Sequence, residues 1–222
     1  MKNILLALIA AVGLFGSSSN AEDYWPKSYF ARAGLNFSYS SGDLDERSIS
    51  LRDTSGEKMR MYPPSLGVMF SPDIELGVNM RFFSLSVSFQ YSWLTPVLTD
   101  DPSQESTDVT FWRFGFEFLY NFNWPEDFQV GVGLGYSFTT LYIGNSAYLD
   151  EEAYRSRLLG SGVGFILNAH YYFTEHVAIV PAVKIYENWF KNVYTGPSEL
   201  WDLDPYKWQT FFGVSLSVQY QF

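Results

Sequence analysis

Ionisable residues occur at positions where a β-strand would point them away from its apolar face. They are Arg32, Glu75, Arg81, Arg113, Glu117, His170 and Lys184. If the strands form a β-barrel, these groups would face its lumen, where they could form a proton path or a catalytic site. They could also pair with one another, because a buried charge without a partner is strongly unfavourable. We predict a structural, non-catalytic ionic network in the lumen, formed by Arg32, Glu75, Arg113, Glu117 and Lys184.

The two histidines lack the neighbours that nucleophilic catalysis needs. His170 is predicted to point inward near a short turn that contains His176, and neither has a serine at the spacing of a catalytic triad. The chain has no cysteine, which excludes thiol catalysis, disulfides and thiolate zinc sites. We expect no enzymatic activity and no cofactor.

Acidic side chains gather in polar segments at about residues 41–64, 95–108, 144–158 and 191–207. Two groups of carboxylates could hold a divalent ion loosely: Asp43, Asp45 and Glu46 in the first segment, and Asp100, Asp101 and Glu105 in the second. Neither group has the carboxylate spacing and the glycine of a calcium loop. Loops kept solvated by their charge are the simpler interpretation, and no metal site is predicted.

The N-terminal segment has the layout of a secretory signal peptide. Lys2 precedes an apolar run from Ile4 to Phe15, and small residues lead to Ala21. We predict a signal peptide at residues 1–21, cleaved after Ala21, and one mature domain at residues 22–222. The net charge of −10 makes nucleic acid an improbable partner, since binding there depends on neutralising phosphates.

The remainder of the chain alternates apolar residues with small polar ones in eight stretches. They lie near residues 29–39, 66–80, 85–93, 111–122, 129–138, 163–173, 177–185 and 211–222. Every second side chain of a strand points to the same face, so each stretch predicts a strand with one apolar face. Pro72 and Asp73 are expected to interrupt the second stretch.

The connections between these stretches alternate in length. Those at residues 81–84, 123–127 and 174–176 are short, whereas the four acidic segments are long. Short turns at one end and long loops at the other are typical of an up-and-down antiparallel barrel. The sequence predicts an all-β fold, an eight-stranded antiparallel up-and-down transmembrane β-barrel.

The chemistry of the two faces indicates which one is outside. A soluble, lipocalin-like barrel would need a charged outer face, but the polar face here is mostly Gly, Ser, Asn and Gln. Phe, Tyr and Trp crowd the apolar face and are too bulky to converge inside eight strands. Aromatic residues also gather at strand ends, as in the interfacial girdles of membrane barrels. The apolar face is therefore predicted to meet lipid.

The chain resembles the small eight-stranded outer-membrane β-barrel proteins of Gram-negative bacteria, the outer membrane protein β-barrel domain family. The resemblance rests on the signal peptide, the eight short alternating strands and the closing "VSLSVQYQF". It implies a location in the outer membrane of a Gram-negative bacterium, with outer-membrane lipid, lipopolysaccharide and the assembly machinery as partners. It also implies that the last strand is an assembly signal, carried here by Val218, Tyr220 and Phe222.

Three functions remain open for such a barrel, because strand alternation is shared by proteins with unrelated roles. A structural or surface-interaction role, with a filled lumen, acidic outer loops and a monomeric barrel, is the leading hypothesis. Narrow porin-like transport of small or apolar solutes would need a less filled lumen. A lipid-modifying enzyme would need a polar triad at the outer, lipid-facing rim.

Overall fold

The computed structural model describes residues 28–45, 48–52, 56, 58–80, 82–94, 108–123, 128–148, 151–195 and 199–222. The elements are β1 (Ser28–Gly42), η1 (Asp43–Asp45), β2 (Ile49–Arg52), β3 (Lys58–Tyr62), β4 (Val68–Asn79), β5 (Phe83–Leu94), β6 (Val109–Asn123), β7 (Phe128–Tyr148), β8 (Glu151–Tyr172), β9 (Val177–Thr195) and β10 (Glu199–Gln221). Within these ranges, none of the elements is a helix long and apolar enough to cross a bilayer. The predicted signal peptide at residues 1–21 lies outside the described residues.

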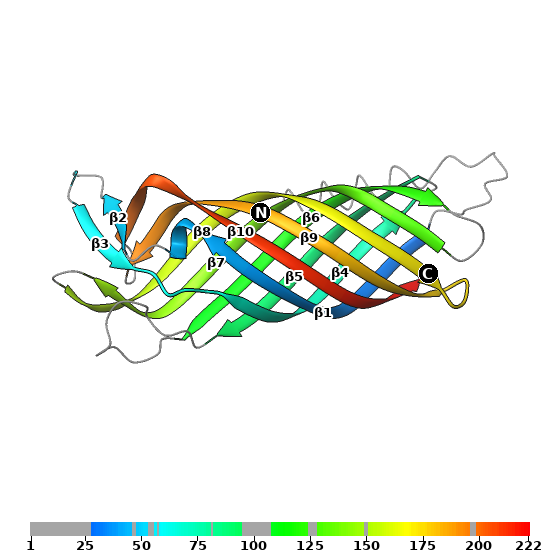
Figure 1. The fold of residues 1–222 in the computed structure, drawn as a ribbon, viewed down its shortest axis with the longest axis horizontal. Coiled ribbons are helices and arrows are strands. Elements are labelled where there is room, and N and C mark those ends of the chain that lie inside the picture. Colours follow the sequence, from blue (N-terminus) through cyan, green and yellow to red (C-terminus); the bar gives the residue numbers. More distant parts are fainter. Residues whose placement is uncertain are drawn as a thin grey trace.

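Eight strands form a closed antiparallel ring in the order β1, β4, β5, β6, β7, β8, β9, β10 (Figure 1). The ring closes where β1 pairs with β10, from Phe30 opposite Gln221 to Gly42 opposite Gln209. Closure leaves no strand edge with unpaired N–H and C=O groups, which a bilayer would not tolerate. The predicted eight-stranded antiparallel barrel is confirmed.

Strand β10 shows how the alternation becomes two faces of the wall. Its outward side chains are well exposed, Phe212 at 44% and Leu216 at 59%, whereas inward Gln219 is completely buried at 0%. The other strands follow the same rule, so a belt of exposed Phe, Leu, Val and Tyr surrounds a polar interior. In water this surface would be an aggregation hazard, but in lipid it is the expected exterior.

Pro72 and Asp73 interrupt the apolar set in the sequence, but the strand itself is continuous. Strand β4 passes through both residues, with Pro72 exposed like Ile74 and Asp73 buried like Glu75. The ladder between β4 and β5 begins only at Asp73, so Pro72 lies just beyond it. A proline is tolerated at such a position because no N–H is needed for the ladder on that side.

Inward glycines make room for two large aromatic side chains of β9. A Cβ atom at Gly164 would lie 2.5 Å from the Tyr186 ring, and one at Gly160 would lie 2.8 Å from the Phe190 ring. On β7, a Cβ atom at Gly135 would lie 2.5 Å from the Tyr186 hydroxyl. Both rings are completely buried. The glycines therefore shape a lumen that is filled by side chains.

The end of the barrel opposite the C-terminus differs from the predicted set of long loops. The segment 41–64 contains η1 and a hairpin of β2 and β3, while β7 to β10 extend through most of 144–158 and 191–207. Residues 95–107 lie outside the described residues. Two of the four predicted loops are thus largely strand and a third contains a hairpin, and we call this part of the molecule the outer extension.

The β2–β3 hairpin closes a second ring inside the outer extension. Leu51 of β2 lies opposite Leu203 of β10, and Met61 of β3 lies opposite Tyr148 of β7. The hairpin and the ends of β7, β8, β9 and β10 therefore form a continuous ring of six strands, at the end far from the C-terminus (Figure 1). The main barrel continues into a smaller one.

The interior of this second ring is mainly apolar, although Ser156, Thr195 and Lys207 are also buried there, and we call its apolar part the apolar cap. It comprises the buried side chains of Leu44, Ile49, Leu51, Met61, Leu66, Val109, Leu141, Ile143, Leu158, Val193 and Leu203. Each is at most 5% exposed. Burial of one such side chain contributes about 1.5–3 kcal/mol, so the cap is a substantial core of its own.

Candidate functional site

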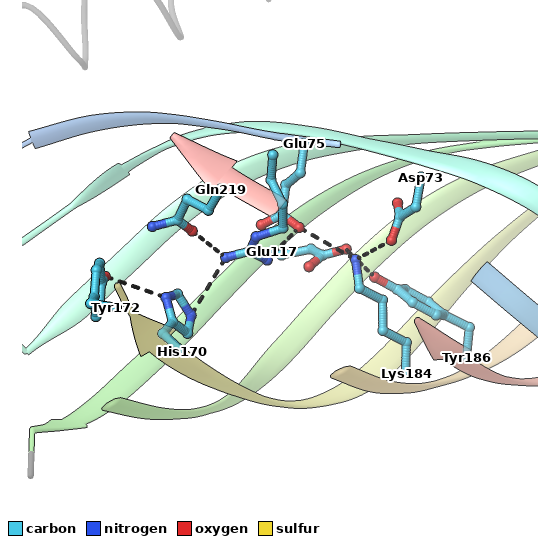
Figure 2. Close-up of polar contacts among 9 residues, drawn as sticks. Asp73, Glu75, Glu117, His170, Tyr172, Lys184, Tyr186 and Gln219 are labelled. Carbon is cyan, nitrogen blue, oxygen red and sulfur yellow. Dashed lines mark hydrogen bonds and ion pairs between the residues drawn. The ribbon is translucent and has the colours of Figure 1, made fainter. Parts of the chain in front are cut away.

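Lys184 of β9 is the centre of a charged cluster in the lumen (Figure 2). Its Nζ lies 2.9 Å from Oε1 of Glu117, 3.3 Å from Oδ2 of Asp73 and 3.5 Å from Oε2 of Glu75. All four side chains are at most 3% exposed. One ammonium group therefore joins carboxylates from β4 and β6 across the barrel.

Arg32 of β1 extends the cluster toward the C-terminal end of the barrel. It donates to Oε2 of Glu75 and to Oε1 of Gln219, both at 2.8 Å. Its Nη2 lies 3.5 Å from Nε2 of His170, whose Nδ1 lies 3.4 Å from the Tyr172 hydroxyl. Figure 2 shows these groups as one continuous row of contacts.

Arg113 of β6 joins the cluster through an aromatic ring and not through a carboxylate. Its guanidinium carbon lies 3.8 Å from the centre of the Tyr186 ring. The Tyr186 hydroxyl in turn donates to Oε1 of Glu117 at 3.1 Å. Arg113 is 4% exposed, so this cation–π contact is shielded from solvent.

The residues proposed for the network from the sequence all occupy the lumen, but sequence reasoning missed two members. Asp73 contacts Lys184, and Tyr186 links Glu117 to Arg113. A signal for Asp73 was available, since it stands two residues before Glu75 and so shares its face. Tyr186 likewise stands two residues after Lys184. Arg81, the other predicted inward cation, lies outside the described residues.

The row of contacts is poorly suited to moving protons. A relay needs groups that can both donate and accept a hydrogen bond, and the guanidinium of Arg32, which lies between His170 and Glu75, offers only donors. His170 is 1% exposed, and among the residues drawn in Figure 2 it contacts Arg32 and Tyr172. The arrangement is better suited to cross-linking strands around the lumen.

The acidic residues of η1 bind the protein's own groups. Oδ2 of Asp43 accepts from the Trp208 backbone N–H at 2.9 Å, and Oδ2 of Asp45 accepts from the Gly42 N–H at 2.9 Å. The other suggested carboxylates, Glu46, Asp100, Asp101 and Glu105, lie outside the described residues. Across the described ranges, no group of three His, Asp or Glu residues is arranged to hold a metal ion.

The C-terminal residues are on the outward face, at the end of the ring closure. Val218, Tyr220 and Phe222 are 55%, 48% and 69% exposed. The backbone N–H of Phe222 donates to the carbonyl of Tyr29 at 2.8 Å, and Nδ1 of His176 lies 3.0 Å from the carbonyl of Gln221. The terminus is thus fixed on both sides, and its role as an assembly signal stays a prediction.

A family model matches residues 15–188, and its description is "Domain of unknown function (DUF2715)". The chain belongs to this family. A search of curated proteins gives no match. The family description carries no activity, so the solved structures with a similar fold are the more informative comparison.

Solved structures with a similar fold are small outer-membrane barrels. OprG of Pseudomonas aeruginosa is 12% identical, with a TM-score of 0.55, over 91% of this chain and 99% of OprG. Neisserial surface protein A is 16% identical, with a TM-score of 0.52, over 89% of this chain and all of that one. Ail, the attachment invasion locus protein of Yersinia pestis, solved with the heparin analogue sucrose octasulfate, is 10% identical, with a TM-score of 0.52 and the same coverages. The resemblance to small eight-stranded outer-membrane barrels is confirmed for the fold, and it implies an outer-membrane location.

Proposed function

We propose that this protein is a closed outer-membrane barrel that presents its outer extension as an interaction surface, without enzymatic or transport activity. The observation that carries the proposal is the pair of barriers along the lumen. The ionic cluster around Lys184 fills one part, and the apolar cap fills the other. A barrel built for passage would leave a continuous aqueous path between its two ends.

The outer extension offers the chemistry of a binding surface. Arg157 of β8 lies between two tyrosine rings, its guanidinium carbon 4.6 Å from the centre of the Tyr194 ring and 5.9 Å from that of Tyr142. Nearby on β9, Nζ of Lys191 lies 5.7 Å from the centre of the Tyr206 ring. Tyr and Arg are the residues that most often dominate binding energy at protein surfaces.

Exposed cations also occur on the β2–β3 hairpin. Lys58 and Arg60 are exposed on β3, in a chain whose net charge is −10. Acidic residues predominate in these segments, but Lys58, Arg60, Arg157 and Lys191 are local cationic positions among them. They suggest a partner that presents spaced anionic groups, such as a sulfated polysaccharide. The Ail structure with a heparin analogue is an analogy at the level of the fold, and it makes heparin a suitable probe.

Bilayer recordings test the closed lumen. The refolded protein, inserted in a planar bilayer, is expected to give no conductance steps under conditions in which an open porin conducts. Reproducible steps would contradict the closed barrel and favour the transport alternative.

Cysteine labelling tests the orientation of the outer extension, since the chain has no native cysteine. Lys58→Cys and Arg60→Cys should react with a membrane-impermeant maleimide on intact cells. Glu175→Cys, exposed in the turn between β8 and β9 at the other end, is the matched control and should react only after lysis. Labelling of Glu175→Cys on intact cells would reverse the orientation.

Attachment to immobilised heparin tests the interaction surface. Cells that display the parent barrel should bind heparin-coated plates better than cells that display Arg157→Gln with Lys191→Gln. Both substitutions of this double variant remove exposed or half-exposed cations, so the variant barrel should accumulate to the same level as the parent. Equal binding by parent and variant would eliminate an anionic partner at these residues and leave the closed barrel intact.

A further inference from the structure

A small cavity separates the ionic cluster from the apolar cap inside the lumen. Its polar wall consists of Arg113, Lys184, Gln90, Asn36 and Ser38, which come from β1, β5, β6 and β9. Its volume is about 10 Å³, counted as the space open to the centre of a water-sized sphere. That is room for one particle about the size of a water molecule.

Arg113 faces this cavity with hydrogen-bond donors that have no partner. Its Nε and Nη2 atoms are buried and make no hydrogen bond, and the same is true of Nε2 of Gln90. The two residues are neighbours across β5 and β6, where Gln90 lies opposite Arg113. Three unpaired N–H donors from adjacent side chains are therefore available to one occupant.

The carboxylates of the lumen pair with other cations, each through one of its two oxygens. Among the described residues, Asp73 and Glu117 pair with Lys184, and Glu75 pairs with both Lys184 and Arg32. None of these ion pairs includes Arg113, which contacts the Tyr186 ring. A guanidinium group that is 4% exposed is expected to need a counter-charge.

We propose that this cavity binds one small monoatomic anion, a halide such as chloride, held by Arg113 and Gln90. A halide accepts hydrogen bonds from several donors at once and has no proton to place. A water molecule would direct its two protons at acceptors, and in the described lining Oδ1 of Asn36 is the acceptor atom without a partner. It is also only slightly larger than a water molecule. Asn36 can turn its amide to add an N–H, since the orientation of that group follows from its partners.

The rings of Phe111 and Phe211 close the site on the side of the apolar cap. Their centroids are 5.2 Å apart, and both side chains are 2% exposed. Gly213 leaves the space on the opposite wall, because a Cβ atom there would lie 2.7 Å from Oδ1 of Asn36. The bound ion would therefore be enclosed, and it would be captured while the barrel folds.

Crystals of the protein refolded in sodium bromide test the site directly, because bromide has an anomalous scattering signal. We expect one anomalous peak in the lumen within hydrogen-bond distance of Nε and Nη2 of Arg113. A refined water with no anomalous signal at that position would overturn the proposal. This readout needs only the parent protein, so it does not depend on whether any variant folds.

Stability measurements test the role of the arginine. Parent protein refolded in sodium bromide should unfold at a temperature about 2–4 °C higher than in sodium gluconate of equal ionic strength, since a ligand of the native state raises the midpoint. Arg113→Gln should lose this difference. Arg32→Gln, which removes a buried arginine that already has a carboxylate partner, should keep it. Equal bromide dependence in both variants would also overturn the proposal.

Discussion

Replacing Lys184 by methionine removes the one ammonium group that joins three buried carboxylates. In the parent its Nζ lies within 3.5 Å of Glu117, Asp73 and Glu75. After the substitution, Arg32 still pairs with Glu75, but Asp73 and Glu117 lose their cation. Removing one partner of a buried ion pair destabilises a protein by about 3–5 kcal/mol, and we expect a loss at the upper end of that range.

Urea unfolding in detergent micelles, followed by tryptophan fluorescence, measures this loss. Lys191→Met is the matched control, because Lys191 is on the same strand but exposed, where it makes a cation–π contact with Tyr206. That contact is worth about 0.5–1 kcal/mol at an exposed site. Similar free energies of unfolding for the two variants would refute the view that Lys184 holds the lumen together.

A double variant separates lost pairing from lost packing. Lys184→Met combined with Glu117→Gln removes a carboxylate that the single variant leaves without a cation. The double variant should therefore be more stable than the sum of the two single effects predicts, by about 0.5–3 kcal/mol. Strict additivity would mean that the Lys184–Glu117 contact at 2.9 Å contributes nothing to stability.

Three further changes test other parts of the structure. Gly164→Ala should lower the free energy of unfolding by about 1–3 kcal/mol, because the added methyl group would clash with the Tyr186 ring. The same urea titration measures this loss, and adding Tyr186→Leu should relieve part of it. An unchanged free energy of unfolding in Gly164→Ala would contradict the tight fit. Val132→Arg should cost about 2–4 kcal/mol if Val132 faces the middle of the bilayer, and vesicle refolding as stable as the parent would reverse the assigned faces. Deleting Phe222 removes one side chain, worth roughly 1.5–3 kcal/mol, together with its backbone hydrogen bond to Tyr29. The variant should still refold in detergent but should fail to accumulate in the outer membrane. Equal accumulation of parent and variant by immunoblot would make Phe222 only an interfacial anchor.

The ring of eight strands could be predicted because each strand of a membrane barrel alternates apolar side chains toward lipid with polar side chains toward the lumen. In "FFGVSLSVQYQF", every second residue from Phe212 to Phe222 is apolar, and the structure places that set outward. The same reasoning gave the inward positions of Arg32 and Lys184. It could not give their partners, because the contact between Lys184 and Asp73 depends on how strands distant in sequence are aligned.

The filling of the lumen was harder to predict. Bulky aromatic residues were expected only on the outward face, yet Tyr186 and Phe190 are completely buried inside. They fit because glycines on the neighbouring strands, including Gly160 and Gly164, leave space for the rings. To predict this filling, the inward glycines have to be considered together with a large residue on the adjacent strand or two strands away. The pattern within a single strand does not reveal that relation.

The sequence predicts loops in the outer extension because the alternation there has the opposite polarity. On β9, outward Ile185 is 37% exposed and inward Lys184 is buried, but farther along outward Lys191 is exposed and inward Val193 is completely buried. An apolar set that points inward, beneath a polar exterior, is the pattern of a barrel in water. The strand therefore passes from lipid into water without ending, and its core changes from polar to apolar between Lys184 and Val193.

This inversion explains how one chain can have one part of its wall in lipid and another part in water. Each part of the wall has only one apolar face, toward lipid in the main barrel and toward the cap in the outer extension. The mean hydropathy consequently stays near zero, at −0.07, which is compatible with passage through water before insertion. The apolar cap also gives the outer extension a core that does not depend on lipid. An extension ordered by such a core suits the proposed interaction surface, because an ordered surface loses less conformational entropy when it binds.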